Sequence, residues 1–182
     1  MSIEADLLRT LGERRVRFVA IGVWGVNQYA NDVRELFATE DKDLFLPLDA
    51  ENLLQAWQAA EAVGLELWAG DEPLDQPRDR VLAGAVVDRR ALTRGSDGKG
   101  LLVDYTLVMA SFDFDVVWNQ RRVFLLDGVE VPVARLDHIL TSKAAAGRAK
   151  DKLFFTTYEQ VLGELERREY HRGFGDPQGP RS

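Results

Sequence analysis

The chain has 182 residues, 46% of them apolar and 29% charged, which suits one soluble domain with a hydrophobic core. Its net charge of −7 argues against a protein that coats nucleic acid non-specifically, because such proteins need a surplus of Lys and Arg. The lack of cysteine excludes disulfides and thiolate sites, and two histidines are too few to favour a histidine-based centre. With no signal-like start and no membrane-length apolar run, we expect a cytoplasmic protein without membrane partners.

The first half of the chain alternates helical and extended patterns. Apolar spacing predicts helices over residues 6–13, 23–37 and 49–63, and strands over 16–21, 43–46 and 65–68. Residues 70–80 are polar and proline-bearing, so we expect a loop there. Residues 81–93 are ambiguous, and their later part favours a strand; residues 94–100, rich in glycine, are predicted as a turn-rich connection.

The second half begins with the strongest strand pattern, over residues 101–109. A short helix is predicted over 115–120, and a hairpin over 121–133 that turns at Asp127 and Gly128. A helical pattern follows from 135 to 170, with one break near Gly147. These patterns predict an α/β (α+β) domain over residues 1–170, in which a mixed β-sheet has flanking and C-terminal helices. The glycine- and proline-rich residues 171–182 are expected to form a disordered tail.

Three aspartates are candidate metal ligands. Asp41 and Asp43 are two residues apart at the start of a strand, so both side chains lie on one face of it. Two carboxylates placed in this way can share Mg²⁺. Asp104 lies inside an apolar strand, where a buried acid needs a partner. A divalent cation held by the other two would be such a partner. The alternatives are a solvated strand edge for the pair and an arginine partner for Asp104.

A basic cluster follows in an otherwise acidic chain. Residues 135–152 contain five Lys or Arg and two acids, a local charge of +3. Lys143 is seven residues after Leu136 and four after Ile139, so it lies on the apolar face of its helix. A lysine in that position either extends along the surface to solvent or reaches a triphosphate.

The ordered motifs resemble those of a known family. A strand ends in Ile21-Gly22-Val23-Trp24-Gly25-Val26-Asn27, Asp41-Lys42-Asp43 follows, then Val103-Asp104-Tyr105, and then Lys143 with Gly147-Arg148-Ala149-Lys150-Asp151. This order is similar to that of minimal nucleotidyltransferases of the polymerase-β-like superfamily, especially the branch of the AbiEii-type toxins. The resemblance covers residues 16–161, which is most of the chain.

The resemblance implies a nucleotidyltransferase fold, an NTP as substrate and two Mg²⁺ or Mn²⁺ ions. Asp41, Asp43 and Asp104 would be the catalytic, metal-binding carboxylates. The nucleotide-binding residues that it implies are Gly22, Val23, Asn27, Lys143, Arg148 and Lys150. The metals would polarise the α-phosphate, and the backbone N–H groups after the first strand would hold phosphate oxygens.

The sequence departs from the family pattern near these residues. Val23 stands where the family has a second small residue, and its branched side chain would crowd a phosphate. Gly25 could move the close approach one turn further along the helix. Lys42 separates the paired aspartates where an apolar residue is more usual, and its charge could fold back onto them.

Three functions are therefore carried forward. The first is a metal-dependent nucleotidyltransferase that moves an NMP from an NTP to a hydroxyl of RNA (for example tRNA), a protein or a small molecule. The second is a catalytically impaired protein of the same fold that binds or regulates a partner, for example in a toxin–antitoxin pair. The third is an unrelated phosphohydrolase with an aspartate metal site. The identities of the NTP and the acceptor, and the oligomeric state, are left open by the sequence.

Overall fold

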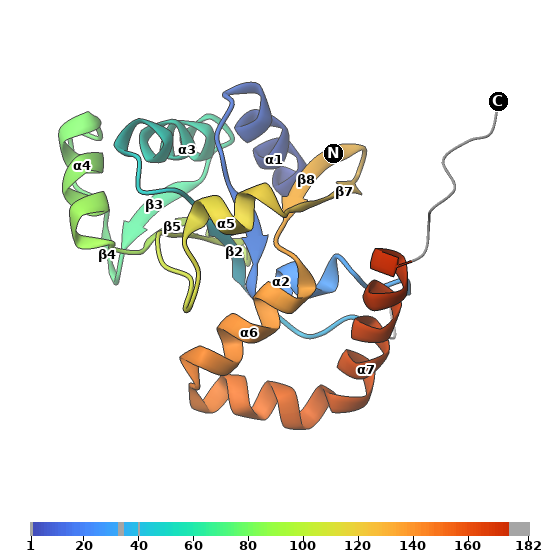
Figure 1. Ribbon diagram of the computed structural model, residues 1–182. Helices are drawn as coiled ribbons and strands as arrows, with labels where there is room; N and C mark the ends of the chain where they lie inside the picture. Colours follow the sequence, from blue (N-terminus) through green and yellow to red (C-terminus); the bar gives the residue numbers. More distant parts are fainter. Residues whose placement is uncertain (1, 33–34, 40, 175–182) are drawn as a thin grey trace.

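The computed structural model describes residues 2–32, 35–39 and 41–174 (Figure 1). Within these ranges the helices are α1 Ile3–Glu13, α2 Gly22–Asn27, α3 Ala50–Ala62, α4 Arg80–Arg89, α5 Phe114–Asn119, α6 Leu136–Ala146 and α7 Ala149–Phe174. The strands of the same ranges are β1 Val19–Ile21, β2 Asp41–Phe45, β3 Glu66–Ala69, β4 Glu72–Pro73, β5 Thr93–Ser96, β6 Leu102–Thr106, β7 Arg122–Leu126 and β8 Val129–Val133.

The strands form one mixed sheet, which confirms the predicted fold class. Their order is β4-β3-β5-β6-β2-β1-β8-β7, and β2 pairs in parallel with β6, as β1 does with β8. The other neighbouring strands are antiparallel. In Figure 1, α1 and α3 lie on one side of the sheet, while α6 and α7 extend on the other.

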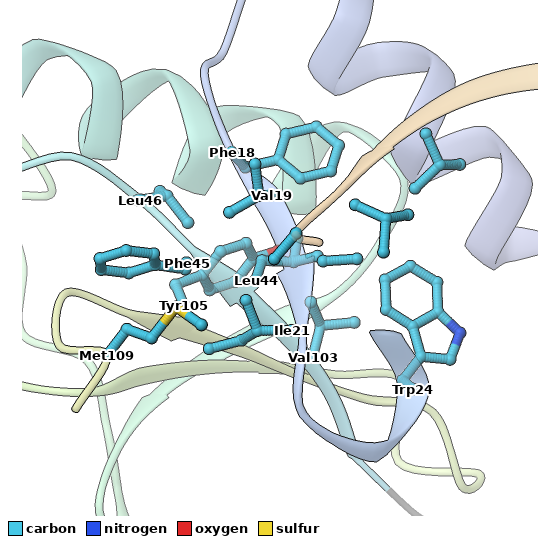
Figure 2. Packing of buried hydrophobic residues seen from close by; sticks show 14 of the residues in the cluster. Phe18, Val19, Ile21, Trp24, Leu44, Phe45, Leu46, Val103, Tyr105 and Met109 are labelled. Atoms are coloured by element: carbon cyan, nitrogen blue, oxygen red, sulfur yellow. The ribbon is translucent and has the colours of Figure 1, made fainter. Parts of the chain in front are cut away.

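A continuous apolar core joins the sheet to these helices (Figure 2). Leu44, Val103 and Tyr105 are buried from the central strands, and Trp57 is buried from α3. The indole N–H of Trp57 donates to the hydroxyl of Thr93 over 3.0 Å, which satisfies the polar atom of this large side chain. Because successive strand residues face opposite ways, Asp43 and Asp104 lie on the sheet face opposite Leu44 and Tyr105.

The predicted helix over residues 23–37 is wrong in its second half, since α2 ends at Asn27. The Asn27 side chain makes two hydrogen bonds to the backbone of Phe37. Its amide nitrogen donates to the Phe37 carbonyl over 2.9 Å, and its amide oxygen accepts from the Phe37 N–H over 2.8 Å. An asparagine that bonds to main chain in this way competes with helix continuation. The described residues between α2 and β2, 28–32 and 35–39, therefore form a loop that Asn27 closes.

The strand favoured for the later part of residues 81–93 is also wrong, because α4 runs from Arg80 to Arg89. Its start is set by Asp79, whose carboxylate accepts from the Leu82 N–H over 3.0 Å. The turn predicted over residues 94–100 begins later than expected, since Thr93–Ser96 is strand β5. Gly95 suits this strand because a Cβ there would approach Leu65 Cδ1 to 3.2 Å and the Tyr105 hydroxyl to 3.4 Å.

The C-terminal predictions are closer to the structure. The hairpin turns at Asp127 and Gly128, which both have positive φ, and the helical region is interrupted at Gly147. The last helix continues to Phe174, beyond the predicted limit of 170. Residues 175–182 of the expected disordered tail lie outside the described part of the chain. Within that part, no helix combines the length and apolarity needed to cross a bilayer.

Candidate active site

A cleft of about 860 Å³ lies between the sheet face that carries the aspartates and the helices α6 and α7. One wall holds the carboxylates of Asp41, Asp43 and Asp104 from β2 and β6. The opposite wall holds the cations Lys143, Arg148 and Lys150 from α6, α7 and their junction. The structure thus gathers, in one cleft, the acidic and basic residues that the sequence singled out separately.

The strand register brings the acids together. Asp43 lies directly beside Asp104 where β2 and β6 run in parallel, and Asp41 is two residues earlier on the same face of β2. Burial, which is the largest cause, and the nearby charges of Asp104 and Asp41 together raise the pKa of Asp43 to about 6. Lys143 and Lys150 across the cleft partly oppose that rise. Asp43 is therefore a carboxylate in need of a cation.

Gly22 allows the first strand to pass close to Asp43. Its φ of +65° lies in the left-handed region, and a Cβ on Gly22 would stand 2.1 Å from Oδ2 of Asp43. Both the backbone conformation and the close approach thus exclude other residues at this position. Gly25 serves packing instead: a Cβ there would meet the Ala20 carbonyl oxygen and Ile139 Cδ1, both at 3.0 Å. It faces the core, so it does not take over the role expected of a second glycine.

Asp104 has an arginine partner. Arg94 on β5 is paired with it across the strands, and its Nε and Nη2 donate to the two carboxylate oxygens over 2.5 and 2.9 Å. The same Nη2 lies 3.6 Å from Oδ2 of Asp41. Hydrogen bonding to Asp104 raises the pKa of Arg94, so the guanidinium is charged at every physiological pH. The arginine partner that the sequence suggested for Asp104 is therefore Arg94.

Arg94 was missed by the sequence analysis because its segment was assigned to a turn. The register of the β5–β6 hairpin pairs Thr93 with Tyr105 and Ser96 with Leu102, which places Arg94 opposite Asp104. Recognising β5 as a strand would have revealed the pair, since directly opposed residues of antiparallel strands have neighbouring side chains.

The donor chemistry of the site fits one divalent cation on two carboxylates. Asp41 and Asp43 supply hard oxygen ligands from a single strand face, as Mg²⁺ and Mn²⁺ require. Both oxygens of Asp104 are engaged by Arg94. Accordingly, within residues 2–32, 35–39 and 41–174 no group of three or more His, Cys, Asp or Glu side chains is arranged to hold a metal ion. Asp104 thus differs from Asp41 and Asp43 in its arginine partner, and the role of all three as metal ligands stays a prediction.

The basic wall is organised around a buried acid, Asp151. Its side chain is 1% exposed and accepts from Lys143 Nζ over 3.3 Å and from Arg148 Nε over 2.7 Å. Burial lowers the pKa of Lys143, and Asp151 opposes that effect. Lys143 also lies over the Phe154 ring, 4.9 Å from its centre. These contacts hold Lys143 on the cleft wall, in agreement with its predicted apolar helix face.

The resemblance also implied nucleotide binding by Val23, Asn27 and Lys150, and only some of these residues lie at the cleft. Val23 and Lys150 line the cleft, but Asn27 does not, because its amide is committed to Phe37. We therefore assign Asn27 to the loop rather than to the nucleotide. Lys42 does not fold back on the aspartates; its Nζ lies 3.9 Å from Glu4 on the opposite sheet face and 5.9 Å from the centre of the Trp24 ring.

Neither a protein-family model nor a curated protein sequence matches the chain. Among solved structures it is similar to the solution structure of the antibiotic-resistance factor ANT(2'')-Ia, an aminoglycoside nucleotidyltransferase. The TM-score is 0.53 at 15% sequence identity, and the match covers 93% of this chain and 90% of that one. This likeness identifies the fold as that of a nucleotidyltransferase.

Proposed function

We propose that this protein is a metal-dependent nucleotidyltransferase that transfers an NMP from an NTP to a hydroxyl acceptor. The observation that carries the proposal is the arrangement of Asp41 and Asp43 on one strand face, across a cleft from Lys143, Arg148 and Lys150. A nucleotide triphosphate needs both elements: oxygen ligands for its cation and positive charge for its phosphates. The fold shared with ANT(2'')-Ia supports the same class of reaction.

Asp41 and Asp43 would hold the divalent cation, which supplies polarisation of the phosphate and a lower pKa for the attacking hydroxyl. The acceptor hydroxyl gives up its proton to water, its oxygen attacks the α-phosphorus, the bond from that phosphorus to the α,β-bridging oxygen breaks, and pyrophosphate leaves. Lys143, held in place by Asp151, stabilises the negative charge that develops on the phosphates. Arg148 and Lys150 also line the cleft and add positive charge to the same wall.

A second function is a protein of the same fold that binds a partner without transferring a nucleotide. Two observations favour it: the branched side chain of Val23 lines the cleft beside Gly22, and Arg94 already neutralises Asp104. Such a protein could regulate a partner, for example in a toxin–antitoxin pair of the AbiEii type that the sequence resembles.

Calorimetry with each of the four NTPs in Mg²⁺ or Mn²⁺ separates the two functions. We expect at least one NTP to bind to the wild type, and far more weakly to a protein that carries both Asp41→Asn and Asp43→Asn, because the cation that accompanies the nucleotide loses its ligands. Asp71→Asn, which removes an exposed acid from a distant turn, is the matched control and should bind as the wild type does. No binding of any NTP to the wild type would favour the non-catalytic function.

Transfer itself is tested with α-labelled NTP and fractionated cell extract as the source of acceptors. A labelled RNA, protein or small molecule that is absent with Asp43→Asn would support the transferase. Release of inorganic phosphate or pyrophosphate without any labelled acceptor would instead identify a phosphohydrolase.

A further inference from the structure

Arg94 brings a fixed positive charge into the acidic wall of the cleft. Its guanidinium makes two hydrogen bonds to Asp104, 2.5 and 2.9 Å long, and extends to within 3.6 Å of Asp41. The Asp104 side chain is 8% exposed and that of Arg94 is 35% exposed, so the pair has one buried and one cleft-facing partner. A guanidinium matches a carboxylate with two parallel bonds, which makes this pairing specific to arginine.

This pairing changes what the third acid can do. A buried carboxylate in a strand needs a positive partner, and Arg94 meets that need without an added ion. A cation that coordinated Asp104 would lie beside the guanidinium of Arg94. The two positive charges would repel each other strongly, because bulk water does not screen charges inside the cleft. Among residues 2–32, 35–39 and 41–174, neither Asp41 nor Asp43 has such a bidentate partner; Asp41 lies 3.6 Å from Nη2 of Arg94.

We propose that Arg94 is a built-in cation that takes the place of a metal ion at Asp104, so that the cleft binds one divalent cation rather than two. Arg94 is then a positioning residue: it fixes the charge and orientation of Asp104 and leaves Asp41 and Asp43 as the metal ligands. The inference rests on the proposed function only in taking the cleft to bind a metal–nucleotide complex.

The test counts bound Mn²⁺ per chain by electron paramagnetic resonance, at a saturating concentration of the α,β-methylene analogue of whichever of ATP, CTP, GTP and UTP binds. Such an analogue cannot be cleaved at the α-phosphate. We expect about one Mn²⁺ in the wild type, and about two in Arg94→Ala and Arg94→Gln, because three carboxylates without a resident cation provide a two-metal site. Arg94→Gln keeps a hydrogen-bond donor near Asp104 and removes the positive charge. It supplies the Mn²⁺ count if the alanine variant does not fold. Adding Asp104→Asn to Arg94→Gln should return the count to about one.

Two matched controls accompany these variants. Arg94→Lys restores a positive charge and should bind about one Mn²⁺, while Arg89→Ala removes an exposed arginine of α4 and should behave as the wild type. A purely structural ion pair would leave the count unchanged in every variant, and that result overturns the proposal. Two Mn²⁺ ions in the wild type would also overturn it while leaving the transferase function intact. A folded wild type that binds no Mn²⁺ and none of the four α,β-methylene analogues would contradict the proposed function as well.

Discussion

At the scale of single residues, the site depends on the contact between Gly22 and Asp43. Gly22 directly follows Ile21, the last residue of β1, which is paired with Asp43 of the antiparallel strand β2. Gly22 has the positive φ of +65° that turns the chain from β1 into α2, and the space where its Cβ would stand is taken by the Asp43 carboxylate. The sequence suggested Gly22 for phosphate binding. The structure adds a second reason for glycine at this position, because any side chain would clash with the Asp43 carboxylate.

Replacing Gly22 by alanine should destabilise the protein by more than about 2 kcal/mol, because left-handed strain and a steric clash with Asp43 act together. Urea unfolding of the purified variant measures this change. Gly70→Ala is the matched control: its φ of +61° is similar, but nothing lies within 4 Å of its added Cβ. It should cost only the strain, about 1 kcal/mol. Equal losses in the two variants would show that the contact with Asp43 is unimportant.

Asp43 should also make the stability depend on pH. Its pKa in the folded protein is about 6, whereas the ordinary value is 3.8, so the folded state binds the proton more tightly. Stability in EDTA should therefore fall as the pH rises from about 4 to 6 and level off above that range. Asp43→Asn removes this dependence and should be more stable than the wild type at pH 7.5 by roughly 2–3 kcal/mol.

The measurement is the difference in unfolding free energy between wild type and Asp43→Asn from pH 4.5 to 8. Added Mn²⁺ should reverse the order above pH 6, since the cation favours the ionised carboxylate that only the wild type possesses. A difference that stays constant across this range would contradict the raised pKa.

At the scale of elements, the loop between α2 and β2 is fixed to α7. Arg168 donates to the two oxygens of Glu35 over 2.8 and 2.9 Å, and to the Tyr29 carbonyl over 3.2 Å. The Phe37 ring packs against Tyr158, with ring centres 4.6 Å apart. Thr39 of this loop lines the cleft, so these contacts connect the helix wall to the strand that carries the acids.

Asn27→Ala should loosen this loop and lower the stability by about 2 kcal/mol, because the buried N–H and C=O of Phe37 lose their partners. Hydrogen exchange by NMR should show faster exchange of the Phe37 amide. Gln28→Ala is the control, since that side chain bonds only to the Trp24 carbonyl of the preceding helix. If nucleotide affinity collapsed while the Phe37 amide stayed protected, Asn27 would be a nucleotide ligand after all.

At the scale of the whole molecule, one hydrophobic core extends from α1 to α7. Leu7 and Leu11 of α1 belong to the same buried cluster as Phe154, Leu162 and Leu165 of α7. The helix wall of the cleft is therefore anchored in the core that also contains the sheet. We propose that residues 2–174 behave as a single domain.

This predicts a single cooperative unfolding transition. Far-ultraviolet circular dichroism follows the helices, and tryptophan fluorescence follows the four tryptophans, of which Trp57 is fully buried in the core. The two signals should give the same midpoint. An NTP with Mn²⁺ should raise that midpoint with ligand concentration, because binding to the folded state alone shifts the equilibrium. An earlier transition of the helical signal would mean that α6 and α7 form a separate unit.

The sequence by itself determined much of the fold, and it singled out acidic and basic residues that line the cleft. Regular apolar spacing identified α1, α3 and β6, and the turn residues Asp127 and Gly128 identified the hairpin, because these signals are local. The paired aspartates and Lys143 were recognised for the same reason: residues on one strand or helix face share a side by geometry alone.

Only the tertiary structure decided how these groups are partnered. The Arg94–Asp104 pair depends on strand β5, and the Asn27–Phe37 closure overrides a helical pattern. Both are side-chain contacts between residues ten positions apart, which no local periodicity encodes. The same holds for Gly22, whose close approach to Asp43 exists only once β1 and β2 have paired. Local sequence propensity determines which residues form helices and strands. The sheet determines which charged side chains of the cleft are paired, because it brings residues that are distant in the sequence together.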